Sequence, residues 1–166
     1  MLEAVEVRPA RPTDADALAV VYMESAELHY RLDPSVYTRP EIDMVEKRYR
    51  DRLSDLADAQ ILVAQYGLDI IGYIELQIRR PDGRARMLRD LVAAEVDMAV
   101  LDEYRGRGIG SLLLRSGEEW AVAHGAELMV LNTHAANVDA IRFYQERQGY
   151  RTAGLFLTKR PDRAER

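Results

Sequence analysis

The glycine-rich segment Val100–Gly110 constrains the fold most, because it joins an expected strand directly to an expected helix. Three of its last five residues are glycine, and glycine has no Cβ to keep a ligand away from the backbone. A helix that begins at Ile109 presents unpaired N–H groups and the positive end of its dipole, and phosphates bind well there. No Ser, Thr, Asp or Asn precedes this helix as a cap. The segment therefore predicts a backbone site for an anionic ligand.

Two familiar phosphate-binding motifs do not fit this segment. A Walker loop requires a lysine, and the segment contains none. A dinucleotide-binding turn requires Gly-x-Gly-x-x-Gly, whereas the glycines here stand at 106, 108 and 110. Arg105 and Arg107 would add positive charge beside the expected anion. The alternative is a flexible glycine-rich turn without a ligand.

The bulk composition narrows the class of protein. The 166 residues fit one domain, which we expect over 1–160 with a tail at 161–166. The absence of cysteine excludes disulfides, a thiolate nucleophile and thiolate metal sites. A net charge of −5 disfavours a nucleic-acid partner, and no apolar run is long enough for a membrane span. The N-terminus does not resemble an export signal, so a cytoplasmic location is expected.

Hydrophobic periodicity predicts strands and helices along the whole chain. The pattern predicts the order β-α-α-β-β-β-α-β-α-β. The expected strands span 5–8, 60–66, 69–78, 95–100, 127–132 and 150–158, and the expected helices span 13–30, 41–57, 109–124 and 138–148. The loop at 79–89 carries five arginines and reads either as a solvated loop or as a rim that selects an acidic acceptor.

Two motifs together resemble the GNAT superfamily of N-acetyltransferases. The run Arg-Gly-Arg-Gly-Ile-Gly at 105–110 is similar to the family's Arg/Gln-x-x-Gly-x-Gly/Ala loop, which binds the pyrophosphate of coenzyme A. The run 137–144 matches the family's Asn-x-x-Ala-x-x-Phe-Tyr element, and Gly149-Tyr150 follows where the family has Gly-Phe. The resemblance implies a single N-acetyltransferase domain with an α/β (mixed α+β) fold. Its mixed, mostly antiparallel central sheet would have six to seven strands and be flanked by four helices, and it would splay between the strands at 96–100 and 128–132.

The resemblance implies that acetyl-CoA is the cosubstrate and that no metal is used. The three histidines show no metal-ligand spacing. The residues expected to hold the coenzyme are Met98, Val100, Arg105, Gly106, Arg107, Gly108, Ile109, Gly110, Ser111, Asn137 and Tyr144.

Acetyl transfer to an amine needs a base, an oxyanion stabiliser and a proton for the leaving thiolate. The resemblance implies that Tyr144 donates this proton and that Asn137 binds the pantetheine arm. Glu95 and Asp97 point to the same side of their strand, and either one is a candidate to deprotonate the ammonium. The alternative for each acid is an ion pair with a nearby arginine.

The amine acceptor stays open between a small molecule and a protein N-terminus or lysine. Topology and the resemblance place the acceptor pocket on the first two helices and nearby strands, at Tyr30, Leu32, Tyr37, Tyr73 and Glu75. A homodimer is possible, because family members often dimerise. The rival hypothesis is a domain that senses acetyl-CoA without catalysis.

Overall fold

The structure is a computed structural model that describes residues 5–82, 91–155 and 157–160. Contacts divide the chain into two compact units, residues 1–134 and 135–166. Each unit is described by itself, and the single domain expected over 1–160 stays a prediction. The expected tail at 161–166 and the arginines at 84, 86 and 89 lie outside the described residues.

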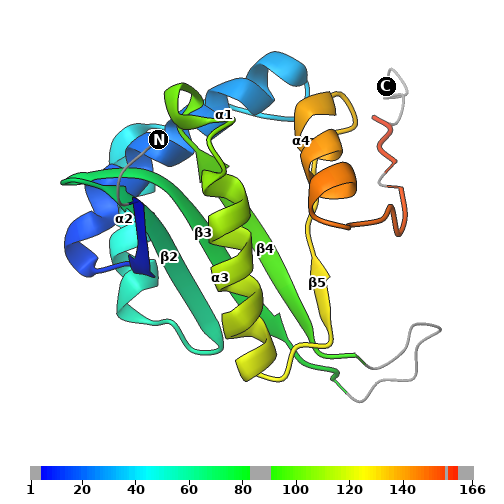
Figure 1. The fold of residues 1–166 in the computed structure, drawn as a ribbon. Coiled ribbons are helices and arrows are strands. Elements are labelled where there is room, and N and C mark those ends of the chain that lie inside the picture. Colours follow the sequence, from blue (N-terminus) through cyan, green and yellow to red (C-terminus); the bar gives the residue numbers. More distant parts are fainter. Residues whose placement is uncertain (1–4, 83–90, 156, 161–166) are drawn as a thin grey trace. The chain divides into compact units, whose positions relative to one another are not determined.

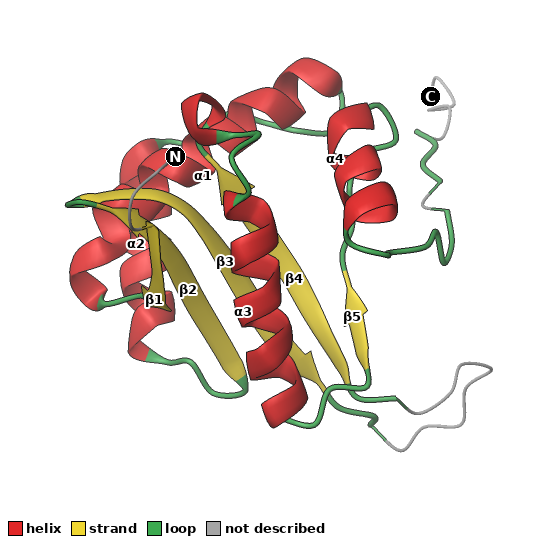
Figure 2. Ribbon diagram, viewed as in Figure 1, coloured by secondary structure: helices red, strands yellow, loops and turns green. Residues whose placement is uncertain are grey.

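The first unit holds a twisted sheet with helices on both of its faces, and Figures 1 and 2 trace its path. Its strands are β1 (Val5–Pro9), β2 (Ala59–Tyr66), β3 (Asp69–Arg79), β4 (Ala93–Val100) and β5 (Leu128–Val130). Its helices are α1 (Ala15–Leu32), α2 (Ile42–Ser54) and α3 (Ile109–Ala123), with short 3-10 turns at Pro12–Asp14 and Asp102–Tyr104. The second unit contains α4 (Val138–Arg142), which runs on into a π-helical turn at Phe143–Arg147.

The strands lie in sequence order in one sheet. Neighbouring strands from β1 to β4 pair antiparallel, and β5 pairs parallel with β4. The sheet is therefore mixed and mostly antiparallel, as the sequence predicted.

The predicted number of six to seven strands is wrong, because the described residues form five strands. The expected strand at 150–158 forms no ladder in its described part. Its apolar residues Leu155 and Leu157 are 83% and 84% exposed. β-propensity depends on packing against cross-strand neighbours, so the alternating pattern of this segment does not by itself produce a strand.

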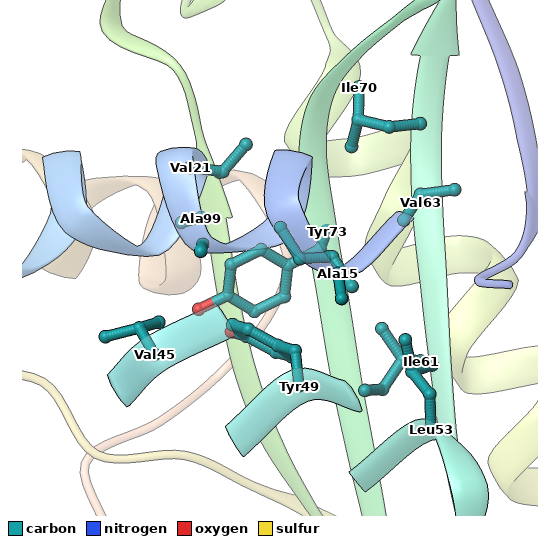
Figure 3. Close-up of a cluster of buried hydrophobic side chains, with 12 residues drawn as sticks. Ala15, Val21, Val45, Tyr49, Leu53, Ile61, Val63, Ile70, Tyr73 and Ala99 are labelled. Carbon is teal, nitrogen blue, oxygen red and sulfur yellow. The ribbon is translucent and has the colours of Figure 1, made fainter. Parts of the chain in front are cut away.

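The two faces of the sheet are set by alternation along β3. Ile74 and Leu76 face α3, where Gly117 lets the helix approach: a Cβ added to Gly117 would lie 2.7 Å from Ile74 Cδ1. Tyr73 points to the opposite face and packs with Tyr49 of α2 in the main apolar cluster. Figure 3 shows these two rings among aliphatic side chains, and they meet edge to face with an interplanar angle of 69°. The remaining labelled members of that cluster are Ala15, Val21, Val45, Leu53, Ile61, Val63, Ile70 and Ala99.

β4 and β5 pair over only part of their length. Their register joins Ala93 to Leu128 and Glu95 to Val130, where β5 ends. β4 continues to Val100, so its second half pairs only with β3 within the described sheet. The splay expected between the strands at 96–100 and 128–132 stays a prediction.

Candidate active site

The glycine loop after β4 has a backbone that only glycine adopts easily. Gly106 and Gly108 have φ angles of +73° and +85°, in the left-handed region. A Cβ at either position would meet no atom within 4 Å, so the conformation and not a lack of space calls for glycine. Gly108 precedes α3 as its N-cap without a side-chain cap, and Leu112 N–H donates the first intrahelical bond to the Gly108 carbonyl at 3.0 Å. The first N–H groups of α3 therefore receive no acceptor from a capping side chain, and their contact with an anion stays a prediction.

The two arginines of the loop are partly engaged within it. Arg105 donates from Nε to the Val100 carbonyl at 2.9 Å, and its Nη1 lies 3.0 Å from Asp102 Oδ1. The Arg107 guanidinium lies 5.5 Å from the centre of the Tyr104 ring. Arg105 thus braces the end of β4 against the loop, and its contact with an anion stays a prediction.

The two acids of β4 have different partners. Glu95 is exposed and forms an ion pair with Arg79, with Nε 2.9 Å from Oε2. Asp97 accepts a hydrogen bond from the Tyr73 hydroxyl at 3.0 Å. The alternative weighed for both acids, an arginine partner, is therefore observed for Glu95, whereas the hydrogen bond described for Asp97 comes from a phenol.

Asp97 has a raised pKa. The largest cause is desolvation, because neighbouring side chains displace water from around the carboxylate even though part of Asp97 stays accessible to solvent. The hydrogen bond from Tyr73 lowers the pKa, the charge of Glu75 raises it, and the charges of Arg48 and His29 lower it. An accessible carboxylate that binds a proton more readily than usual has the properties of a general base.

Glu75 lies directly opposite Asp97 in the register of β3 and β4. Its carboxylate accepts from Arg52 Nε at 2.8 Å and lies 3.5 Å from Arg48 Nη2. The side chain of Glu75 is only 15% exposed. Two arginines of α2 therefore neutralise the charge of Glu75.

Sequence analysis missed this arginine pair, although the helical spacing could have indicated it. Arg48 and Arg52 are four residues apart on α2, beside the buried stripe that contains Tyr49. Arg48 also lies 4.8 Å from the ring centre of Tyr22 and 5.0 Å from that of Tyr49. Which acids they meet depends on packing between the helix and the sheet, which the sequence pattern does not specify.

The predicted acceptor residues fall into two groups. Tyr73 and Glu75 lie beside Asp97 on β3, as described above. The other three lie near the end of α1 or just beyond it, and Leu32 is the last residue of that helix. The guanidinium of Arg39 lies over the ring of Tyr30, 3.9 Å from the ring centre. Tyr37 packs against two histidines. These histidines are His29 and His134, with ring centres 5.1 and 5.9 Å from that of Tyr37. The contribution of His29 to the pKa of Asp97 links the two groups.

In the second unit, Asn137 precedes the helical segment 138–147 and Tyr144 lies within it. Asn137 is the N-cap of α4, and its Oδ1 accepts from Ala140 N–H at 3.3 Å. Tyr144 lies in the π-helical turn, so the α-helix expected over 138–148 ends at Arg142 and continues with wider turns. The Tyr144 ring packs edge-on against Phe143 and Tyr150, with ring centres 5.2 and 5.6 Å away. The roles predicted for Asn137 and Tyr144 stay predictions.

The described residues bear on metal binding and on membrane insertion. No three or more His, Cys, Asp or Glu side chains among them are placed to hold a metal ion. Across the same ranges, no helix combines the length and apolar character needed to cross a bilayer.

Comparison with known proteins identifies relatives of this chain. The model of the acetyltransferase (GNAT) family matches residues 24–150. The aminoalkylphosphonate N-acetyltransferase of Salmonella typhimurium is 35% identical over 91 residues, which cover 55% of this chain and 56% of that enzyme. An acetyl transferase of Oryza sativa is 30% identical over 97 residues, which cover 54% of this chain and 23% of that protein. The chain thus spans about half or less of the length of these two relatives.

Solved structures share the fold over nearly the whole chain. A tetramutant of the BH1408 protein of Bacillus halodurans superposes with a TM-score of 0.85 at 19% identity, covering 94% of this chain and 99% of that one. The aminoglycoside N-acetyltransferase AAC(6')-Iy in complex with CoA gives a TM-score of 0.67 at 18% identity, covering 95% of each chain. At these identities the likeness shows the fold.

Proposed function

The chain belongs to the acetyltransferase (GNAT) family, and from this premise we propose that it transfers the acetyl group of acetyl-CoA directly to a primary amine. The observation that carries the proposal is the uncapped start of α3 at Gly108, which offers main-chain donors to a diphosphate. The structural neighbour in complex with CoA supports the choice of coenzyme by likeness of fold. The sensor hypothesis has no specific observation in its favour.

We assign the base to Asp97 and not to Glu95. A protonated amine must lose a proton before its nitrogen can attack the thioester carbonyl, and a carboxylate with a raised pKa accepts that proton more readily. Glu95 is held as the partner of Arg79 at the surface. Asp97 remains accessible, and the hydrogen bond from Tyr73 fixes its orientation.

The remaining steps follow from the groups around this carboxylate. Attack of the neutral amine forms a tetrahedral oxyanion, which backbone N–H groups near Met98 and Val100 would stabilise. Collapse of that intermediate breaks the carbon–sulfur bond and releases the coenzyme as a thiolate. We assign the proton that neutralises the thiolate to the hydroxyl of Tyr144. The acetylated nitrogen then loses its extra proton, which restores the phenol through water and leaves a neutral amide. No covalent acyl-enzyme is needed, because the chain has no cysteine and shows no nucleophilic elbow around a serine.

The acceptor is proposed at the level of chemical class, as a compound with a primary amine. The name of the Salmonella relative specifies an aminoalkylphosphonate, and one structural neighbour, AAC(6')-Iy, is in complex with the bisubstrate analog CoA-S-monomethyl-acetylneamine. Both are small molecules, so small amines are the first acceptors to test.

The test is release of free coenzyme A thiol from acetyl-CoA in the presence of a panel of amines that includes aminoalkylphosphonates, aminoglycosides, polyamines and peptides with free N-termini. We expect acetyl-dependent thiol release with at least one amine. Asp97→Asn should reduce kcat/KM about 10²-fold or more, and Glu95→Gln should keep most of it. Tight coenzyme binding without thiol release for any amine would favour the sensor instead. Loss of activity in Glu95→Gln with an active Asp97→Asn would reverse the assignment of the base.

A further inference from the structure

A second acid lies next to the proposed base and faces the same side of the sheet. Glu75 on β3 and Asp97 on β4 are cross-strand partners in the register. Like charges directly opposite each other on one face of a sheet repel, and their Cβ atoms are about 5 Å apart in such pairs. Such a pair of acids normally shares protons, because the ionised form of one makes ionisation of the other harder.

The repulsion between these two carboxylates is offset by cations that contact Glu75. The two oxygens of Glu75 are both engaged, Oε1 by Arg52 at 2.8 Å and Oε2 by Arg48 at 3.5 Å. Both arginines come from α2, whose buried stripe packs this helix on the sheet. The hydrogen bond described for Asp97 comes from the Tyr73 hydroxyl and not from a cation.

We propose that Arg48 and Arg52 are positioning residues that hold the Glu75 carboxylate against α2 and offset its charge, so that Asp97 alone takes up the proton of the acceptor amine. The proposal rests on the proposed function for the role of Asp97 as the base that deprotonates the amine. The arrangement itself is a property of the protein without substrate, so it can be measured without turnover.

Arg52 is held in place from two directions. Its Nη2 donates to Gln77 Oε1 at 2.6 Å, and its Nε donates to Glu75. Two side chains on the same face of β3 therefore hold one guanidinium. Arg48 is fixed instead by aromatic rings, those of Tyr22 on α1 and Tyr49 on its own helix. A guanidinium held by planar partners loses little conformational freedom when it meets a carboxylate.

The charged and titratable groups that act on Asp97 or contact Glu75 come from three elements. His29 comes from α1, Arg48, Tyr49 and Arg52 come from α2, and Tyr73 and Glu75 come from β3. The phenols stay neutral near physiological pH, because burial raises the pKa values of both Tyr49 and Tyr73. Glu75 is therefore the one acid among these neighbours, and its charge acts on Asp97 unless the arginines offset it.

The experiment follows the protonation of Asp97 by carbon NMR of its carboxyl group in the full chain, as a function of pH and without acetyl-CoA. The signal is assigned by its loss in Asp97→Asn. Arg52→Gln should raise the midpoint of the Asp97 titration by about one pH unit, because one of the cations that offset Glu75 is lost. Arg52→Lys keeps the charge and should restore most of the wild-type midpoint. Glu75→Gln should lower the midpoint instead, because it removes the like charge and leaves the arginines in place.

Arg50→Gln is the matched control. Arg50 lies on the same helix and pairs with Asp16 and Glu46 at the surface, so the change removes the same charge from α2 without touching Glu75. The double variant with Arg52→Gln and Glu75→Gln should return the midpoint toward that of the wild type. If Arg52→Gln proves unstable in thermal unfolding, Glu75→Gln still tests the expected lowering of the midpoint, and Arg52→Lys still tests whether a cation at position 52 keeps it near the wild-type value.

The kinetic counterpart separates this inference from the proposed function. In Arg52→Gln the acid limb of the kcat/KM profile should move upward by about one pH unit, which is an activity loss of about tenfold at a pH below the limb. A midpoint that is the same in the wild type, Arg52→Gln and Glu75→Gln would overturn the positioning role. An active Asp97→Asn would overturn the proposed base, while the NMR titration would still decide the effect of the arginines on Asp97.

Discussion

Replacement of Gly72 by alanine tests how closely β3, β4 and α3 are packed just before the glycine loop. Gly72 pairs with Val100 at the end of β4. A Cβ at position 72 would lie 2.9 Å from the Ala99 carbonyl oxygen, 3.1 Å from Val100 Cγ2 and 3.3 Å from Leu113 Cδ1. The nearest of these atoms belongs to the backbone, so no side-chain rotation can relieve the contact. β4 or β3 must therefore shift.

The magnitude follows from two opposing terms. Overpacking in a core costs about 1–3 kcal/mol, and replacing glycine by alanine regains about 0.4–1 kcal/mol by restricting the unfolded chain. Gly72→Ala should therefore lower the free energy of unfolding by about 1–2 kcal/mol.

Gly117→Ala is the matched comparison. Its Cβ would meet Ile74 Cδ1 at 2.7 Å, the flexible end of a side chain. Turning Ile74 off its rotamer costs about 0.5–1.5 kcal/mol, while alanine in place of glycine inside a helix gains about 1 kcal/mol. This variant should stay within about 0.5 kcal/mol of the wild type. Equilibrium unfolding in urea measures both. A Gly117→Ala variant that is less stable than Gly72→Ala would refute the reasoning, since backbone contacts would then be easier to relieve than side-chain contacts.

Three further predictions concern other parts of the chain. Asp14 accepts two hydrogen bonds from the Arg8 guanidinium at 2.7 and 3.0 Å, which lower its pKa, so Asp14→Asn should cost about 2 kcal/mol of unfolding free energy at neutral pH. A lowered aspartate pKa stabilises the fold only at pH values above that pKa. The difference in unfolding free energy between Asp14→Asn and the wild type should therefore shrink when urea melts are taken to pH values below the usual aspartate range, and a difference that persists there would contradict this role of Asp14. Asn137→Ala removes the cap of α4 and should cost about 1 kcal/mol locally, seen as faster hydrogen exchange of the Ala140 amide, and unchanged exchange would show that the cap is dispensable. Tyr144→Phe should lower kcat at least about 10²-fold with the coenzyme affinity retained, and an equal loss of affinity would assign the hydroxyl to binding.

Local patterns predicted the parts of the fold that depend on neighbouring residues. The glycine loop and the beginning of α3 were predicted because the glycines and the missing cap residue stand at adjacent positions, 106 to 109. The positive φ angles of Gly106 and Gly108 became visible only in the structure. Gly149 likewise has a φ of +75° just after the last helical turn, as expected for a glycine at that end. The strand expected at 150–158 failed because a strand needs a partner, and the alternating pattern alone does not supply one.

The choice between the two acids of β4 could not be made from the sequence. Asp97 and Glu95 are equivalent in the strand pattern, and they differ only through partners on other elements. Arg79 reaches Glu95 across a strand pair, and Tyr73 reaches Asp97 in the same way. These contacts depend on the register of β3 against β4, which joins residues about twenty positions apart.

In the proposed function, main-chain donors at the start of α3 hold the diphosphate of coenzyme A. Isothermal calorimetry with coenzyme A tests it on three proteins: the wild type, Gly108→Glu and Gly125→Glu. Gly125 also has a positive φ, +81°, and open space around its missing Cβ, so the control carries the same strain and the same added charge away from the loop. We expect the wild type and Gly125→Glu to bind with similar affinity and Gly108→Glu to bind at least about tenfold more weakly, because its carboxylate faces the phosphates. Equal binding by Gly108→Glu and the wild type, or no binding by the wild type, would contradict the account.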